Sequence, residues 1–120
     1  MKKILIVDDS KAMRMLVTRS LRQAGYGDCT FLEAADGQQG LGVIRAEQPD
    51  LVLCDWNMPN MLGIDLLKAV RAEGCKVTFG FVTSEVSESI KQQAKDAGAA
   101  FMISKPFTSE AVKSALSVTM

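Results

Sequence analysis

Short runs of apolar residues alternate along the chain with longer stretches in which apolar residues recur every three or four positions. Each short run is bounded by charged or turn-forming residues, which is typical of a strand buried on both faces of a sheet. The longer stretches have the spacing of amphipathic helices. We therefore predict strands at residues 4–7, 30–34, 51–54, 77–82 and 100–103, and helices at residues 13–21, 36–47, 64–70 and 87–97, with a last helix capped by Thr108.

The order of these elements indicates the fold class. Five strands that alternate with five helices predict an α/β protein whose parallel sheet is doubly wound, with helices on both faces and right-handed crossovers. The chain has 120 residues, 48% of them apolar, and no repeat or low-complexity linker, so we predict one domain over residues 1–120. Ligands of such sheets bind at the carboxyl ends of the strands.

Charge and cysteine usage exclude several kinds of partner. The 14 basic and 14 acidic residues are interspersed, so we predict no nucleic-acid partner. No apolar run approaches the roughly 20 residues that cross a membrane, and the N-terminal run is too short for a secretory signal. Cys29, Cys54 and Cys75 are odd in number and lack CxxC spacing, which indicates reduced thiols and a cytoplasmic protein.

Histidine is absent from the sequence. Its absence excludes Ser-His-Asp and Cys-His nucleophile systems, HExxH zinc sites and phosphoryl transfer through an internal histidine. Any chemistry must therefore depend on carboxylates, hydroxyls and lysine, with at most a hard metal ion.

Residues that could carry such chemistry follow four of the predicted strands. Asp8 and Asp9 come after the first strand, Asp55 after the third, Thr83 after the fourth and Lys105 after the fifth. If the first and third strands are neighbours, the three carboxylates converge, and two carboxylates about 4 Å apart repel by roughly 4 kcal/mol at an effective dielectric near 20. A cation must offset this repulsion. Oxygen ligands suit Mg²⁺, and Lys105 supplies a second positive charge.

Asp55 can also act as a nucleophile towards phosphorus. Such a transfer needs a metal ion on the phosphoryl oxygens, a fixed cation and a hydroxyl or amide donor, roles that Mg²⁺, Lys105 and Thr83 would fill. A cis bond between Lys105 and Pro106 would point the lysine into the site.

Each of these residues has a structural explanation when it is taken alone. Asp8, Asp9 and Ser10 can cap the following helix. Thr83 can satisfy a turn at a strand end, and Lys105 can be a solvated loop residue. Their joint placement at one edge of the sheet is what favours a functional site.

The joint motif resembles that of a known family. The residues Asp8-Asp9, Asp55, Thr83 and Lys105-Pro106-Phe107 are those expected in the response regulator receiver domains of two-component systems. The likeness covers essentially the whole chain, and the stretch DWNMPNM from Asp55 to Met61, followed by Gly63, is similar to the single-domain chemotaxis regulators of this family. The resemblance implies a flavodoxin-like (βα)5 fold with strand order 2-1-3-4-5.

The resemblance also implies roles at the site. Asp55 is expected to accept a phosphoryl group from a histidine kinase, while Thr83 moves towards that group and Lys105 pairs with it. Mg²⁺ is expected to bind Asp9 and Asp55 directly, and Asp8 mostly through water.

Two further residues bear on the metal and on the lifetime of the phosphoryl group. The resemblance adds the backbone carbonyl of Asn57 to the Mg²⁺ ligands. It also implies that Asn57 and Glu85, the pair found in fast-resetting chemotaxis regulators, give a short-lived phosphorylated form. The protein is then no enzyme beyond its own phosphoryl transfer and dephosphorylation.

In this family the fourth helix, fifth strand and fifth helix form the output face, so we expect a downstream protein to bind there. Met102 stands where Tyr or Phe usually precedes the lysine, with Phe101 beside it, and methionine is flexible enough to fill the same pocket. Leu62 replaces an acidic residue before Gly63 and could contact a partner. The charge pattern of the last two helices favours a monomer.

Other readings stay open at this point. An aspartyl-nucleophile phosphatase would carry a second aspartate where Asn57 stands. A nucleotide or flavin site would need a Gly-rich or Ser/Thr-rich loop after the first strand, where Asp8 and Asp9 would repel a phosphate. A docking module that is never phosphorylated, and a receiver cut from a larger regulator, are the remaining alternatives.

Overall fold

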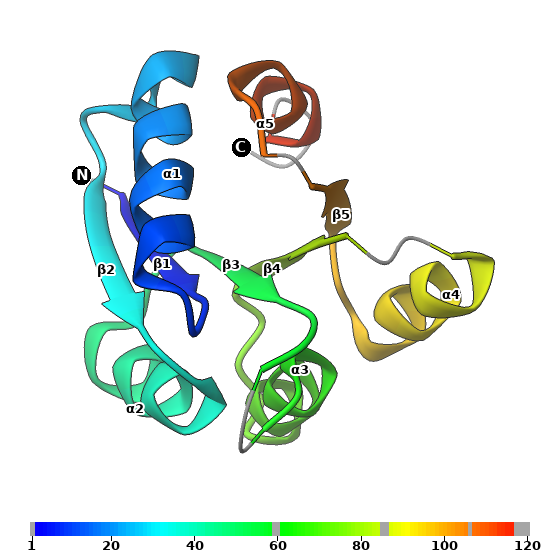
Figure 1. The fold of residues 1–120 in the computed structure, drawn as a ribbon. Coiled ribbons are helices and arrows are strands. Elements are labelled where there is room, and N and C mark those ends of the chain that lie inside the picture. Colours follow the sequence, from blue (N-terminus) through cyan, green and yellow to red (C-terminus); the bar gives the residue numbers. More distant parts are fainter. Residues whose placement is uncertain (1, 59–60, 85–86, 106, 117–120) are drawn as a thin grey trace.

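The computed structural model describes residues 2–58, 61–84, 87–105 and 107–116. Its five strands form one parallel sheet in the order β2-β1-β3-β4-β5, as predicted (Figure 1). The strands are β1 (Lys3–Val7), β2 (Thr30–Ala34), β3 (Leu51–Asp55), β4 (Thr78–Thr83) and β5 (Phe101–Ser104). The strand order reverses beside β1, so the carboxyl ends of β1 and β3 are the place where a ligand site is expected.

Five helices cover the two faces of the sheet. They are α1 (Lys11–Leu21), α2 (Gly37–Glu47), α3 (Gly63–Ala72), α4 (Glu88–Ala97) and α5 (Ser109–Leu116). Helices α1 and α5 lie on one face, and α2, α3 and α4 lie on the other (Figure 1). The predicted doubly wound α/β fold is therefore confirmed. None of the helices in the described ranges is long and apolar enough to span a membrane.

The core consists of two apolar clusters, one on each side of the sheet. In β1, Ile4 and Ile6 belong to the cluster under α1 and α5, whereas Leu5 and Val7 belong to the cluster under α2, α3 and α4. All four side chains are almost fully buried. Since successive residues of a strand point to opposite faces, burial on both faces explains why the strands read as continuous apolar runs.

Short polar side chains cap four of the helices described, whereas α3 begins after Leu62 without a side-chain cap. Ser10 Oγ accepts a hydrogen bond from the amide of Met13 at 3.2 Å, so Ser10 caps α1. Thr108 Oγ1 accepts from the amide of Ala111 at 3.1 Å, which confirms the cap predicted for the last helix. The helical path does not end with α1, because the chain continues as a π-helical turn (Arg22–Tyr26). Within that turn, Gly25 has φ +101°, which favours glycine.

Strand ends differ from the prediction by about one residue. β1 begins at Lys3 and β3 includes Asp55, while β4 and β5 each lie one residue later than the apolar runs suggested. The reason is that backbone pairing continues past the last apolar side chain: Asp55 pairs with Val82 in β4. The shift places the polar residues at the very edge of the sheet.

One close contact joins β4 to β5. Gly80 pairs with Phe101, and a Cβ atom on Gly80 would lie 2.1 Å from Cε1 of the Phe101 ring. The ring therefore occupies the space that a side chain at position 80 would need.

Candidate functional site

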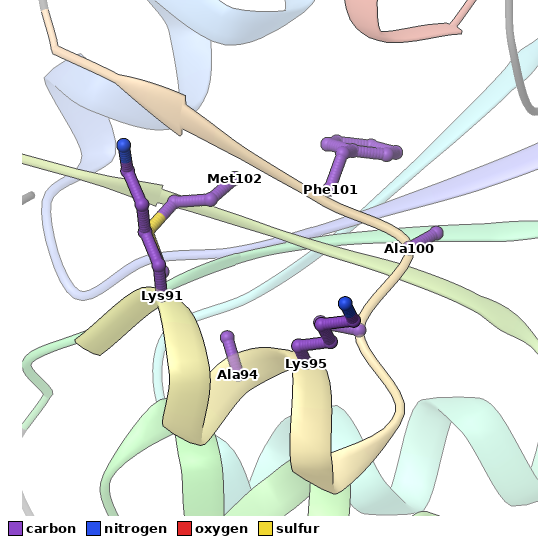
Figure 2. A pocket seen from close by; sticks show the side chains of 7 residues that line it. Lys91, Ala94, Lys95, Ala100, Phe101 and Met102 are labelled. Atoms are coloured by element: carbon purple, nitrogen blue, oxygen red, sulfur yellow. The ribbon is translucent and has the colours of Figure 1, made fainter. Parts of the chain in front are cut away.

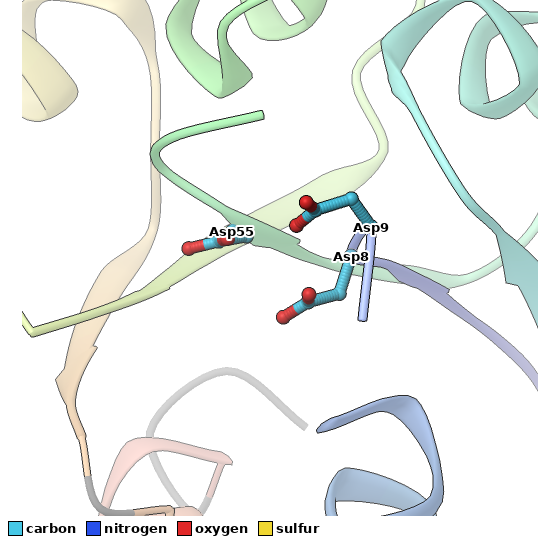
Figure 3. A group of neighbouring side chains, drawn as sticks. All are labelled: Asp8, Asp9 and Asp55. Atoms are coloured by element: carbon cyan, nitrogen blue, oxygen red, sulfur yellow. The ribbon is translucent and has the colours of Figure 1, made fainter. Parts of the chain in front are cut away.

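Three carboxylates converge where β1 and β3 end. One oxygen from each of Asp8, Asp9 and Asp55 lies within 4.8 Å of the others. Figure 3 shows Asp8 and Asp9 at the end of β1 and Asp55 at the end of β3. The cause is the strand register: Val7 pairs with Cys54, so the residues that follow them lie side by side. The predicted convergence is confirmed.

Two of these carboxylates are largely removed from water. The side chain of Asp8 is 6% exposed and that of Asp55 is 11% exposed, whereas Asp9 is exposed. Burial raises the pKa of Asp8, and repulsion from Asp55 and Asp9 adds to the rise. The amide of Ser10, which donates to Asp8 Oδ1 at 2.9 Å, opposes it. The site therefore holds the negative form of Asp8 at a cost in free energy.

Asp55 has a similar environment with a stronger counter-charge. Burial raises its pKa and repulsion from Asp9 contributes, while Lys105 and a hydrogen bond from the Trp56 backbone lower it. Lys105 Nζ lies 3.4 Å from Asp55 Oδ1 and 4.0 Å from Asp8 Oδ2. The lysine is thus placed to hold a negative charge at Asp55 and to stay beside it when more charge is added there.

The charge balance of the cluster fits a divalent cation. Three carboxylates face one ammonium group, so full ionisation leaves two uncompensated negative charges. The donors are all oxygens, which Mg²⁺ prefers, and one or two carboxylates with water complete its usual coordination in proteins. The residues present therefore fit a magnesium ion.

Thr83 and Lys105 reach the same edge from β4 and β5. Thr83 is the last residue of β4, is 1% exposed, and pairs with Ser104. The amide of Lys105 donates to the carbonyl of Thr83 at 2.9 Å, which fixes the backbone from which the lysine side chain extends. All four strands named by the sequence thus bring their polar residue to one edge.

The loop after Asp55 is held by packing. Trp56 is 7% exposed and meets the Phe81 ring edge-on, with centroids 4.9 Å apart. The amide of Gly63 donates to the carbonyl of Trp56 at 3.0 Å. A Cβ atom at Gly63 would lie 2.3 Å from the carbonyl oxygen of Asp55, so only glycine lets α3 begin this close to the site. Asn57 is exposed in the same loop.

Some predicted features lie outside the described residues. Glu85, expected to set the phosphoryl lifetime with Asn57, is among them, and so is Pro106, on which the cis-bond expectation depends. Leu62 is described and is 44% exposed.

Met102 and Phe101 point to opposite sides of β5. Met102 packs against the cluster that includes Ala94 of α4, whereas Phe101 packs against the other cluster (Figure 2). A hollow of about 400 Å³ lies between α4 and β5, and its lining includes Met102, Lys91 and Lys95. Met102 therefore has space beside it on the helix side of the strand.

Sequence reasoning missed one residue that contacts the site. Arg14 Nη1 donates to the backbone carbonyl of Asp8 at 2.6 Å, and its Nε donates to Glu33 at 2.8 Å. In the sequence Arg14 is an ordinary polar position of an amphipathic helix. A contact to a backbone carbonyl leaves no signal in the pattern of apolar and polar residues.

The fold and site define a receiver domain. Residues 4–117 match the family described as the response regulator receiver domain, and the chain belongs to that family. It is 41% identical over 113 residues to the chemotaxis protein CheY of Pseudomonas aeruginosa, covering 92% of this chain and 90% of that protein. It is 38% identical over 116 residues to the probable chemotaxis protein CheY of Rhizobium etli, covering 95% and 88% of the two chains.

Solved structures agree with this assignment. The crystal structure of the chemotaxis protein CheY4 of Vibrio cholerae, obtained at low pH, superposes with a TM-score of 0.89 at 35% sequence identity. The match covers 100% of this chain and 99% of that one. The predicted family and its flavodoxin-like strand order are therefore both confirmed.

Proposed function

We propose that this protein is a chemotaxis-type response regulator in which Asp55 accepts a phosphoryl group from a histidine kinase in a Mg²⁺-dependent reaction. The observation that carries the proposal is the placement of Asp55 within the three-carboxylate cluster, 3.4 Å from Lys105 Nζ. The similarity to chemotaxis proteins of two bacteria supports the pathway. We further propose that the protein is cytoplasmic and monomeric and that residues 1–120 form one receiver domain. Its enzymatic activity would be limited to its own phosphorylation and dephosphorylation.

In the proposed transfer, a carboxylate oxygen of Asp55 attacks the phosphorus of phosphohistidine. The new P–O bond forms as the P–N bond breaks, and the departing imidazole keeps the electron pair. Lys105, already beside Asp55, pairs with the charge that arrives, and Thr83 supplies a hydroxyl donor. Asp9, Asp55 and the carbonyl of Asn57, with Asp8 through water, would hold Mg²⁺, which neutralises charge on the phosphoryl oxygens when bound.

The phosphoryl group then acts as a switch. It gives Lys105 and Thr83 a new anionic partner, and such a local charge change biases an equilibrium between two conformations. We propose that the change reaches a downstream protein through the face formed by α4, β5 and α5. The hollow beside Met102, shown from close by in Figure 2, supports this face because it leaves space into which the methionine could move.

We also propose that the phosphorylated form is short-lived. The support is the sequence pair Asn57 and Glu85, and the exposure of Asn57 beside Asp55 is consistent with access of water to the phosphoryl group.

The test uses Trp56, the single tryptophan of the chain, which lies next to the proposed acceptor. Its fluorescence would be followed during addition of Mg²⁺ and then of acetyl phosphate. We expect a Mg²⁺ response that Asp9→Asn removes, and a donor response that Asp55→Asn abolishes and that decays after the donor is withdrawn. Asp65→Asn, the same substitution at an exposed position of α3, is the matched control and should behave as the wild type.

The outcomes separate the remaining alternatives. A wild type that binds Mg²⁺ and ignores acetyl phosphate would be tested next by transfer from a phosphorylated histidine kinase, with loss of a labelled phosphoryl group in Asp55→Asn as the criterion. A wild type that takes no phosphoryl group from either donor would contradict the proposed acceptor role and favour a docking module.

A further inference from the structure

Arg14 lies in the first turn of α1, behind the acidic cluster. Only 15% of its side-chain surface is exposed. Its Nη1 donates to the backbone carbonyl of Asp8 at 2.6 Å, and its Nε donates to Glu33 Oε1 at 2.8 Å. Since Glu33 belongs to β2, the guanidinium joins the end of β1 to the neighbouring strand. Two directed bonds from one planar group fix both the position and the orientation of that group.

The bond to the carbonyl of Asp8 fixes more than one atom. A peptide unit is planar, so the carbonyl of Asp8 and the amide of Asp9 turn together. On its other side, the amide of Asp8 donates to the carbonyl of Ala34 at 3.1 Å. The backbone of Asp8 is therefore held from both sides, and the direction in which the chain enters Asp9 is set by the contact with Arg14.

Asp9 is the carboxylate that depends most on this backbone. Asp8 accepts from the amide of Ser10, and Asp55 faces Lys105. Within the described part of the chain, the side chain of Asp9 takes part in no hydrogen bond or ion pair, and it is exposed. Its place in the cluster therefore follows from the path of the main chain.

We propose that Arg14 is a positioning residue of the metal site, which presents Asp9 to the cation by holding the Asp8–Asp9 peptide, with Glu33 holding Arg14 in turn. This inference rests on the proposed function, because it takes the cluster to bind Mg²⁺. It assigns no contact between Arg14 and the metal.

Replacing Arg14 has two effects on Mg²⁺ affinity, and they have opposite signs: one comes from the loss of its charge and the other from the loss of its positioning role. A cation near a metal site repels the metal, so removing the charge of Arg14 would tighten Mg²⁺ binding if electrostatics alone mattered. Loss of positioning weakens binding, and residues that orient metal ligands typically change affinity by about tenfold or more. The ion pair with Glu33 already neutralises much of the Arg14 charge, which makes the positional effect the larger one.

The experiment measures Mg²⁺ affinity by titration calorimetry and stability by urea unfolding in the absence of metal. We expect Arg14→Gln to raise the Kd for Mg²⁺ by about tenfold. Arg19→Gln, the same substitution at an exposed position in the last turn of α1, is the matched control and should leave the Kd unchanged. A merely structural role would lower the unfolding midpoint and leave the affinity of the folded protein as it was.

The possible results lead to different conclusions. An Arg14→Gln protein that binds Mg²⁺ as tightly as the wild type, or more tightly, would overturn the positioning role and leave the metal site intact. A wild type that binds no Mg²⁺ would overturn the proposed metal site and this inference with it. If Arg14→Gln does not fold cooperatively, Arg14→Lys serves instead, because it keeps the charge and loses the two-pronged geometry: weaker binding supports the role, and unchanged binding contradicts it.

Discussion

The two ends of the sheet differ in how their charged side chains are buried and paired. At the carboxyl ends of the strands, Asp8 and Asp55 are largely buried and share one lysine, and the carboxylate of Asp9 lies beside them. At the other end, Lys3 pairs with Glu47 and Arg45 with Glu73, one cation to one anion, and all four side chains are more than a third exposed. Exposed pairs of this kind contribute little to stability, whereas buried charges without partners oppose folding. This difference supports the proposal that the acidic end binds a cation.

The largest effect is expected from removing Lys105, the one cation that pairs with the acidic cluster among the residues that the structure describes. Lys105→Ala leaves Asp55 and Asp8 without their counter-charge, so we expect a loss of about 1–2 kcal/mol in the free energy of unfolding without Mg²⁺, less than the 3–5 kcal/mol of a fully buried pair because the lysine is partly exposed. Urea unfolding monitored by circular dichroism measures it. Equal stability of the variant and the wild type would show that the buried ion pairs of Lys105 contribute as little to stability as the exposed pairs at the other end of the sheet.

Removing one of the buried negative charges should raise the stability that Lys105→Ala lowers. Asp8→Asn keeps an acceptor for the amide of Ser10 and removes a charge that burial disfavours, so we expect stability without metal to rise by on the order of 1 kcal/mol. The same variant should gain less from added Mg²⁺ than the wild type does. Unfolding curves with and without Mg²⁺ test both points. A variant that is less stable than the wild type without metal would contradict the claim that the charge of Asp8 opposes folding.

The pH dependence of stability sharpens the comparison further. The folded-state pKa values of Asp8 and Asp55 are raised above the ordinary value of 3.8, so just above that value the folded state binds more protons than the unfolded state. The contribution of these two carboxyls to stability without Mg²⁺ should therefore fall as pH rises through this interval and level off once both are ionised, whereas Glu73, whose pKa is lowered by Arg45, contributes in the opposite direction. The stability difference between Asp8→Asn and the wild type should grow over the same interval, and a constant difference would refute this expectation.

The smallest effect is expected at the opposite end. Glu73→Gln breaks the exposed pair with Arg45, and we expect neither the unfolding midpoint nor the Mg²⁺ affinity to change measurably. A shift as large as that of Lys105→Ala would mean that the surface pair is as important as the buried one.

The fold could be predicted because burial on both faces leaves a direct mark on the sequence. Leu51 to Cys54 can be apolar without interruption only if helices cover both sides, and parallel strands then bring their polar ends to one edge. The convergence of Asp8, Asp9 and Asp55 could therefore be predicted from the sequence. The family resemblance supplied the strand order, which the structure confirms, and the role proposed for Asn57; spacing alone gives neither.

The remaining features depend on tertiary contacts that a one-dimensional pattern does not contain. Arg14 contacts a backbone carbonyl, and Gly63 is required because the carbonyl of Asp55 lies against it. A Cβ atom at Gly40 would lie 3.2 Å from Leu66 and Val7, so the glycine lets α2 pack closely. Strand ends were displaced because backbone pairing does not follow side-chain polarity.

The contact between Gly80 and Phe101 restricts which substitutions these two positions can accept. A side chain of any size at position 80 collides with the ring at position 101, and the ring fills the gap that the glycine leaves. Exchanging either residue alone therefore forces the ring to move or leaves a gap beside it. Descendants of this sequence are therefore expected to change the two positions as a pair or to inherit both unchanged.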